Sequence, residues 1–333
     1  MKLYLLTLAT SLTTLTGVQV EDLAKAGAHP VSVILGSWKD DQRENREILW
    51  KCYLPKDSPG PFPVVIYSHG GGGNRDTNEM LGRHLASYGF ASLHIQHPGS
   101  DDVAVRKSPR SLKAVNSPKE SEPRFRDVHF VTKLLGDPRR LGELSGKLDP
   151  DRVGIAGHSY GGLTAQVIAG QVIKDYDQKL ALPKLKGAFI LSPSPPREDY
   201  GEPSTAFGKM LMPIFSLTGT ADGPPDKAFT AKDRTELFQK ANSVDRWLLV
   251  MEGASHFTLS GQKTKPRIAA LIPGMESDPN LEKNHELMRI AAVAFWRTTL
   301  LQDEEARKYL TEGGFSKRVG SRGTFDFQPG KKQ

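Results

Sequence analysis

A short segment near the middle of the chain, Arg152–Gly162, constrains the fold more than any other. Its first half, Val153–Ala156, is an apolar run of the length that a buried parallel strand needs. The sequence Gly-His-Ser-Tyr-Gly follows at once, and the small and apolar residues after it are typical of a helix. A strand that turns directly into a helix crowds its own backbone, so the residues flanking the serine must lack side chains. The segment therefore predicts a sharp strand-to-helix turn that exposes the hydroxyl of Ser159.

The Gly-x-Ser-x-Gly spacing is weak on its own, because average usage of Gly and Ser produces it by chance in roughly one chain in ten of this length. The chain has 32 glycines, which raises that chance. The preceding strand and the following helix strengthen the signal. Partner residues elsewhere in the chain must decide whether Ser159 has a chemical role.

Size and composition suit a single α/β domain, because 333 residues can bury a large core. The net charge of +7 would also suit a nucleic-acid binder. Lys and Arg are interleaved with Asp and Glu, and no basic block stands out. This pattern favours a solvated surface with a basic bias and no nucleic-acid partner.

Cys52 is the only cysteine, so neither an intrachain disulfide nor a thiolate metal cluster can form. It lies in the apolar run Ile48–Leu54 and is expected to be a small core residue. We expect no metal and no cofactor.

The N-terminus resembles a secretory signal. Lys2 precedes the apolar stretch Leu3–Leu15, which threonines interrupt, and small residues follow at Ala24–Ala26. The stretch is too short and too polar for a permanent membrane anchor. We expect residues 1–28 to be a leader and the protein to be exported to a periplasm or secreted. The alternatives are an N-terminal helix of the mature domain and a cytoplasmic location.

Strand and helix patterns alternate from the third strand onward, which indicates a mostly parallel sheet of eight strands with helices on both faces. The first two strands are expected to be an antiparallel pair. The expected strands are His29–Trp38, Ile48–Leu54, Pro61–Tyr67, Phe90–Gln96, the strand before Ser159, Leu185–Leu191, Pro213–Leu217 and Arg246–Met251. The expected helices include Asn78–Tyr88, Arg124–Leu135, Asp233–Ala241 and Asn284–Leu301.

One domain is expected over residues 29–312. Two polar, proline-containing stretches, 101–123 and 192–209, are predicted to be long surface loops, the second of them a possible lid. Residues 313–333 are polar, glycine-rich and basic, and are predicted to be a flexible tail.

Chemically reactive side chains follow several of the predicted strands. In an open α/β sheet, functional groups gather beyond the carboxyl ends of the strands. A serine hydroxyl needs a base such as histidine, and a carboxylate must orient the imidazole. Asp222 and His256 follow the last two predicted strands, and the order Ser159, Asp222, His256 is that of a known hydrolase arrangement. These three residues are the candidate catalytic triad.

Each partner also has an ordinary structural interpretation. Asp222 could be a turn residue in Ala-Asp-Gly-Pro-Pro, in which case Asp226 is the reserve acid. His256 could be a structural loop histidine. His158 is expected to point away from the serine hydroxyl and to pack or hydrogen-bond locally.

The glycine run Gly70–Gly73 follows the third predicted strand. It is either a flexible loop or one half of an oxyanion hole, in which bare backbone lets an N–H group approach developing negative charge. The first donor is expected to be the N–H of Tyr160, directly after the serine, and the second the N–H of Gly71.

With these residues in place, the chain resembles the α/β-hydrolases of the group that contains platelet-activating-factor acetylhydrolases, dienelactone-hydrolase-like proteins and cutinase-type polyester hydrolases. The likeness runs from about Val31 to Leu301. It is carried by the segments Val65–Gly71, His84–Phe90, His97–Ser100 and Asp151–Gly162 and by Asp222 and His256.

Two departures bear on the substrate. Dienelactone hydrolases use a cysteine nucleophile, whereas this chain has Ser159. Polyester hydrolases of this group carry aromatic residues at the position of Gly71 and after the sixth strand, where this chain reads Ser192–Pro196. The resemblance therefore implies a cofactor-independent serine esterase for short-acyl, small-molecule or lipid-like esters that works through an acyl-enzyme. The rival interpretations are polyester, lipid acetyl-ester or amide hydrolysis by the same residues, and a catalytically silent binding protein.

Overall fold

The structure is a computed structural model, and it describes residues 23–174, 176, 180–196, 198–223, 229–262 and 278–331. Its strands are β1 (Val31–Asp40), β2 (Arg46–Pro55), β3 (Phe62–Ser68), β4 (Ala91–Ile95), β5 (Leu148–His158), β6 (Ala188–Leu191), β7 (Ile214–Ala221), β8 (Arg246–Ser255) and β9 (Gly323–Gln328). Its α-helices are α1 (Glu79–Ser87), α2 (Asp102–Lys107), α3 (Pro118–Leu135), α4 (Tyr160–Ile168), α5 (Pro203–Phe207), α6 (Glu236–Lys240), α7 (His256–Leu259), α8 (Leu281–Leu300), α9 (Glu304–Thr311) and α10 (Gly314–Val319).

The strands form one sheet in the order β1-β2-β4-β3-β5-β6-β7-β8-β9. The run from β4 to β8 is parallel, whereas β1 and β2 at one edge and β9 at the other pair antiparallel with their neighbours. The prediction of a mostly parallel sheet with an antiparallel first pair is confirmed. The sheet is the α/β-hydrolase fold expected from the resemblance, with nine strands instead of eight.

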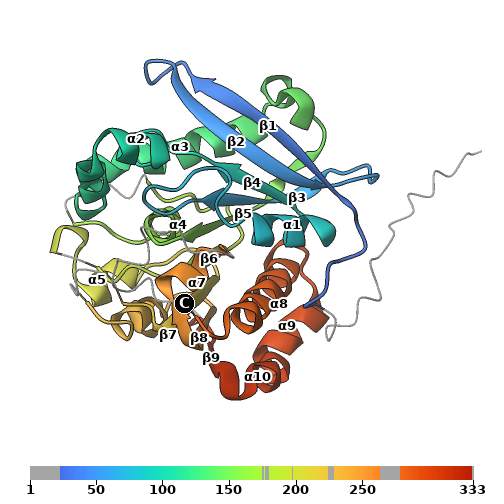
Figure 1. Cartoon of the computed structure of the whole chain (residues 1–333), viewed down its shortest axis with the longest axis vertical. Coiled ribbons are helices and arrows are strands. Elements are labelled where there is room, and N and C mark those ends of the chain that lie inside the picture. The colour runs from blue at the N-terminus through green and yellow to red at the C-terminus, as the bar shows by residue number, and fades with distance from the viewer. Residues whose placement is uncertain are drawn as a thin grey trace, which may run out of the picture.

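Helices cover both faces of the sheet, with α3 and α4 on one side and α1 and α8 on the other (Figure 1). The central strand β3 is buried along its whole length, so its successive residues serve different cores. Val64 and Ile66 pack with α3 and α4, whereas Val65 and Tyr67 pack with α1 and α8. This double coverage leaves the carboxyl edge of the parallel strands as the place where polar side chains can meet.

The stretch 101–123, predicted to be a loop, is helical instead. It contains α2, a 3-10 helix at Pro109–Asn116 and the start of α3. Pro109 and Pro118 each occupy the first turn of a helix, where the missing N–H group needs no partner. The side chain of Asp101 accepts a hydrogen bond from the N–H of Ala104 at 2.9 Å and caps α2. In the second predicted loop, 192–209, the short helix α5 forms.

The prediction of a flexible tail over 313–333 is wrong for its described part, which forms α10 and β9. β9 pairs with β8 along Arg246–Met251. Its aromatic side chains alternate toward the core: Phe327 stacks on Trp247 with 5.1 Å between ring centroids, and Phe325 stacks on Phe215 at 5.9 Å. The alternation of aromatic and polar residues in this segment is typical of a strand, although the tail as a whole has a polar composition.

The predicted leader lies mostly outside the described residues, which begin at Leu23. Leu23 is buried, and its carbonyl accepts a hydrogen bond from His84 Nε2 at 2.9 Å. The N–H of Gly27 donates to Ser87 Oγ at 2.8 Å. The packed region therefore includes residues 23–28, ahead of the predicted boundary at 29. In the described ranges, every helix is too short or too polar to cross a membrane.

Candidate active site

Ser159 lies between β5 and α4 with φ 56° and ψ −115°, a strained conformation for a residue with a side chain. A Cβ atom at Gly157 would collide with the backbone of Gly161, and one at Gly161 would collide with the carbonyl of Ser68. These two glycines are therefore required by backbone crowding, as the sequence predicts. The turn directs Ser159 toward the carboxyl edge of the sheet.

The structure brings Ser159, His256 and Asp222 together from three separate strand ends. His256 Nε2 lies 2.9 Å from Ser159 Oγ, and His256 Nδ1 lies 2.8 Å from Asp222 Oδ1. If Nδ1 carries the proton and donates to the carboxylate, Nε2 is left to accept the hydrogen bond of the serine hydroxyl. The geometry is that of a nucleophile, a base and an orienting acid. The reserve acid, Asp226, lies outside the described residues.

Asp222 is fully buried and stays ionised. Burial favours the neutral acid, but the neighbouring Arg234 guanidinium and the hydrogen bond with His256 together lower the pKa of Asp222 below its ordinary value. Its Oδ2 also accepts hydrogen bonds from Ser192 Oγ at 2.7 Å and Thr218 Oγ1 at 2.9 Å. A charged carboxylate is therefore held at the position where an imidazolium would need it.

His158 does not face the serine hydroxyl. Its Nε2 donates to the carbonyl of His256 at 3.1 Å, and the two imidazole rings lie 4.6 Å apart. Burial and the nearby His256 lower the pKa of His158 well below its ordinary value, so the ring is neutral. His158 was expected to pack or hydrogen-bond locally; its hydrogen bond instead runs to a residue far along the chain, where it fixes the backbone of His256.

The glycine run lies beside Ser159. A Cβ built on Gly70 would be 3.5 Å from Ser159 Cβ, and one built on Gly71 would be 3.8 Å from Tyr160 Cδ1. The N–H groups of the next two glycines are occupied, that of Gly72 by the carbonyl of Ser100 at 2.9 Å and that of Gly73 by the carbonyl of Gly70 at 3.0 Å. Gly71 and Tyr160, the two predicted donors, are therefore neighbours at the serine.

A leucine from the helical stretch after β4 covers Gly71. A Cβ at Gly71 would lie only 2.9 Å from Leu112 Cδ2. The Leu112 side chain is nevertheless 40% exposed. An apolar side chain thus stands open to solvent at Gly71, the position where the resembling polyester hydrolases carry an aromatic residue.

Two comparisons with known proteins fit this geometry. The family described as platelet-activating factor acetylhydrolase, isoform II, matches residues 26–120, which include Gly71 and end before Ser159. Arylacetamide deacetylase from Bos taurus is 30% identical over 159 residues, or 47% of this chain. The chain covers 36% of the length of that relative.

The chain has the α/β-hydrolase fold and is similar in sequence to these two esterase-type proteins over part of its length.

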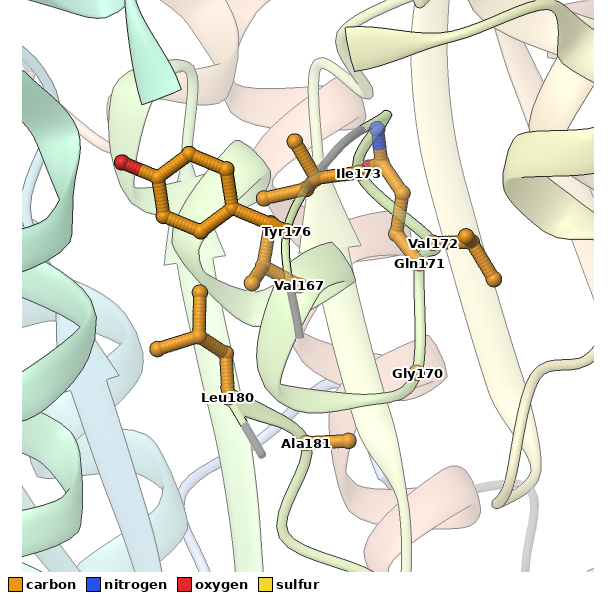
Figure 2. Close-up of a pocket in the computed structure, with 8 residues that line it drawn as sticks. All are labelled: Val167, Gly170, Gln171, Val172, Ile173, Tyr176, Leu180 and Ala181. Carbon is orange, nitrogen blue, oxygen red and sulfur yellow. The ribbon is translucent and has the colours of Figure 1, made fainter. Parts of the chain in front are cut away.

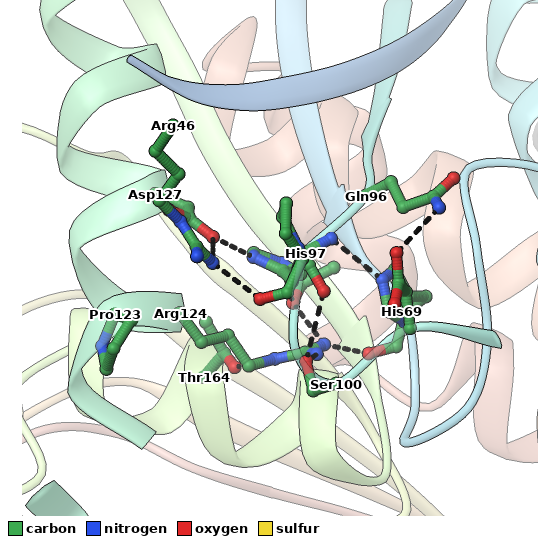
Figure 3. Close-up of polar contacts among 12 residues, drawn as sticks. Arg46, His69, Gln96, His97, Ser100, Pro123, Arg124, Asp127 and Thr164 are labelled. Atoms are coloured by element: carbon green, nitrogen blue, oxygen red, sulfur yellow. Dashed lines mark hydrogen bonds and ion pairs between the residues drawn. The ribbon is translucent and has the colours of Figure 1, made fainter. Parts of the chain in front are cut away.

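In this α/β-hydrolase fold, a buried polar network lies behind the glycine run (Figure 3). Asp127 has no solvent exposure and accepts hydrogen bonds from both Arg46 and His97, the latter through Nδ1 at 3.0 Å. His97 Nε2 lies 2.9 Å from Ser68 Oγ, at the end of β3. Burial lowers the pKa of His97 to about 3, so the ring is neutral at physiological pH. The network ties α3 and the β1–β2 hairpin to the strand that precedes the glycines.

A small apolar hollow lies at the carboxyl end of α4 and is separate from the serine. Figure 2 shows its lining residues Val167, Gly170, Gln171, Val172, Ile173, Tyr176, Leu180 and Ala181. Three of them belong to the buried cluster that includes Tyr160 and Leu163. The hollow is therefore a packing feature behind the site. In the described part of the chain, no group of three or more His, Cys, Asp or Glu side chains is arranged to hold a metal ion.

Two buried arginines at this site were missed by sequence reasoning. Arg234 is 3% exposed; its Nε lies 3.2 Å from Asp222 Oδ2 and also donates to the Asp222 carbonyl at 2.7 Å. Arg124 is 2% exposed and lies behind the glycine run. Arginine is a surface residue by default, so neither stands out in the sequence. A signal existed only for Arg124, which shares an i, i+4, i+7 stripe with Val128 and Val131.

Proposed function

We propose that this protein hydrolyses carboxylic esters by nucleophilic catalysis through an acyl-enzyme. The observation that carries the proposal is the continuous hydrogen-bonded relay from Ser159 through His256 to the buried, ionised Asp222. The two comparisons support it, since both names denote enzymes that remove acetyl groups.

In the proposed reaction, Ser159 Oγ adds to the ester carbonyl carbon while its proton passes to His256 Nε2. The carbonyl oxygen becomes an oxyanion and accepts hydrogen bonds from the N–H groups of Gly71 and Tyr160. His256 then gives the proton to the leaving alkoxide oxygen as the C–O bond breaks, which leaves the acyl group on Ser159. A water molecule attacks that ester, loses a proton to His256 and releases the carboxylic acid, and the proton returns to Ser159.

We propose that the preferred acyl group is short, such as acetyl. Leu112 stands against Gly71 and limits the space beside the proposed oxyanion site. It also occupies the place where an aromatic side chain would hold a planar ring. Both features favour small, soluble esters over aromatic polyesters.

The test is an activity profile over p-nitrophenyl esters of increasing acyl length, beside an acetylated phospholipid, an aryl acetamide and a polyester film. Ser159→Ala should remove nearly all activity, although residual catalysis of about 10³–10⁴ over water can persist. A p-nitrophenyl alkylphosphonate should label Ser159, as peptide mass analysis would show. Labelling at another serine would overturn the assignment, and release of terephthalate from film as fast as turnover of the acetate would overturn the substrate preference.

A further inference from the structure

Arg124, in the second turn of α3, contacts residues on both sides of the proposed oxyanion hole. One side of its guanidinium reaches the glycine run: Nη2 donates to the carbonyl of His69 and to Ser68 Oγ, the latter at 3.0 Å. Nη1 donates to Ser100 Oγ at 2.8 Å, and the carbonyl of that same serine accepts from Gly72. Figure 3 shows the guanidinium pointing at Ser100 and His69.

The other side of the guanidinium reaches the helix that follows Ser159. Nε donates to Thr164 Oγ1 at 2.8 Å, and Thr164 in turn donates to the carbonyl of Tyr160 at 2.9 Å. The centre of the guanidinium lies 4.5 Å from the centroid of the Tyr160 ring. Arg124 is therefore joined to Tyr160 through both its backbone and its ring.

The bond to the His69 carbonyl has a consequence for the N–H groups that follow it. In a trans peptide the C=O and N–H groups point in opposite directions, so fixing one fixes the other. Arg124 holds the peptide between His69 and Gly70 in this way. The carbonyl of Gly70 is held by His69 Nδ1 at 2.6 Å and the N–H of Gly73 at 3.0 Å, and these two bonds set the direction of the Gly71 N–H. Arg124 acts on Gly71 through His69, because it holds the carbonyl of the residue whose ring holds the Gly70 carbonyl.

The charge of Arg124 also matters. Its hydrogen bonds and its ring contact in the described part of the chain are all with neutral groups, and the charge of Asp127 also acts on it from nearby. Burial lowers the pKa of Arg124 to about 10, so the guanidinium keeps its charge at neutral pH. A buried positive charge behind the glycine run favours negative charge in front of it. Only arginine offers five N–H donors in a rigid plane that can reach this many acceptors.

We propose that Arg124 is the positioning residue that holds Gly71 and Tyr160 in register as the two oxyanion donors. This inference rests on the proposed esterase function. It predicts that Arg124 stabilises the transition state and contributes little to binding of the ground-state ester.

The test compares Arg124→Lys and Arg124→Met with the wild-type enzyme, using p-nitrophenyl acetate. Arg124→Met should lower kcat about 100-fold or more, the scale of losing one oxyanion donor, while KM changes less than threefold. Arg124→Lys should recover only part of the loss, because lysine keeps the charge without the planar fork. Active-site titration with the phosphonate corrects kcat for any inactive fraction.

A pair of inhibitors separates positioning from a general structural role. A trifluoromethyl alkyl ketone adds to Ser159 and forms an oxyanion, whereas the matching methyl ketone binds as a neutral carbonyl. Affinity for the trifluoromethyl ketone should fall in parallel with kcat, and affinity for the methyl ketone should stay within threefold. An equal loss for both ketones would overturn the proposal.

Arg246 offers a matched control. It is buried at the start of β8 and donates to the carbonyls of Phe238 and Pro329 and to Asn242 Oδ1. Arg246→Lys should lower thermal stability without changing kcat. If the Arg124 variants do not fold, Ser100→Ala serves in their place, because it removes one of the hydrogen bonds of Arg124. It should lower kcat about 3- to 10-fold, or about 0.7–1.4 kcal/mol, with the same selectivity between the two ketones. An unchanged kcat in Ser100→Ala would overturn the inference.

The experiments distinguish failure of the esterase proposal from failure of the Arg124 proposal. A wild-type enzyme whose activity does not depend on Ser159 overturns both. An active, Ser159-dependent enzyme whose Arg124→Lys and Arg124→Met variants keep kcat within threefold overturns only the role of Arg124.

Discussion

Asp222 is the residue whose charge most directly controls His256. Its Oδ1 lies 2.8 Å from His256 Nδ1, and its buried carboxylate stays ionised beside Arg234. Asp222→Asn keeps the shape but removes the charge and allows the wrong imidazole tautomer. We expect kcat to fall by about 10⁴, as steady-state kinetics with p-nitrophenyl acetate would measure.

Asp226→Asn is the matched variant for that measurement. It should leave kcat within a few fold of the wild type, because the relay to His256 runs through Asp222. The opposite ranking would move the acid to Asp226 and leave the roles of Ser159 and His256 standing.

Leu112 is the side chain expected to limit acyl length. It is exposed, and it stands against Gly71 in the glycine run. Leu112→Ala removes three carbon atoms beside the proposed acyl site and should raise the ratio of kcat/KM for p-nitrophenyl octanoate over acetate about tenfold or more, because even one methylene in an apolar site is worth about 1–3 kcal/mol. Leu211, which is 47% exposed beside Gly170, is the control, and Leu211→Ala should not change the ratio. An equal change in both variants would contradict the assignment.

Among the elements that were not expected, β9 is the one that extends the sheet. Phe325 projects from it toward the core and meets Phe215 and Phe315, the latter edge to face at 4.7 Å. Phe325→Ala should lower the free energy of unfolding by about 1.5–3 kcal/mol. Asp326, the exposed neighbour, is the control, and its replacement by Ala should change stability by less than about 0.5 kcal/mol. Urea unfolding measures both, and equal stabilities would mean that the tail does not pack as a strand.

The helical stretch 101–123 shows why prolines led to a wrong prediction of a loop. Prolines usually mark loops, but Pro109 and Pro118 begin helices because a first-turn residue needs no N–H partner. The same residues can therefore signal either structure. In the folded chain, this stretch lies against the glycine run, with Leu112 at Gly71 and Val105 at Gly72.

For the whole molecule, buried histidines predict acid sensitivity. Burial lowers the pKa of His94 and His97 to about 3 and that of His84 to about 4. The unfolded chain binds these protons near pH 6.5 while the folded chain does not, so the free energy of unfolding falls as the pH drops below that value. Each histidine should contribute a slope of about 1.4 kcal/mol per pH unit between pH 6 and its folded pKa.

His94→Gln isolates one of these contributions. The ring of His94 is buried between Tyr53 and Tyr67, and its Nδ1 lies 3.0 Å from the carbonyl of Thr77. The variant should lose stability at pH 7 but show a shallower pH dependence, by about 1.4 kcal/mol per pH unit between pH 6 and 4. Urea unfolding at fixed ionic strength checks this, and identical slopes would contradict the prediction.

Local patterns in the sequence determined the class of fold and the residues of the candidate relay. The turn around Ser159 follows from backbone crowding between Gly157 and Gly161, which neighbouring residues decide by themselves. Buried strands and amphipathic helices can be recognised from the spacing of their apolar residues along the chain. Because parallel strands end at one edge of a sheet, strand order was enough to predict that Asp222 and His256 would meet Ser159.

Only the tertiary structure decided which distant side chains support that relay. Arg124 lies 35 positions from Ser159 and becomes a neighbour of Tyr160 only when α3 packs against α4. The pairing of Arg234 with Asp222 depends on contacts that the spacing of residues along the chain does not reveal. The same is true of the pairing of β9 with β8. A charged or polar residue has no preference for burial until its partners surround it, because the cost of removing it from water is offset only by hydrogen bonds that the completed fold supplies.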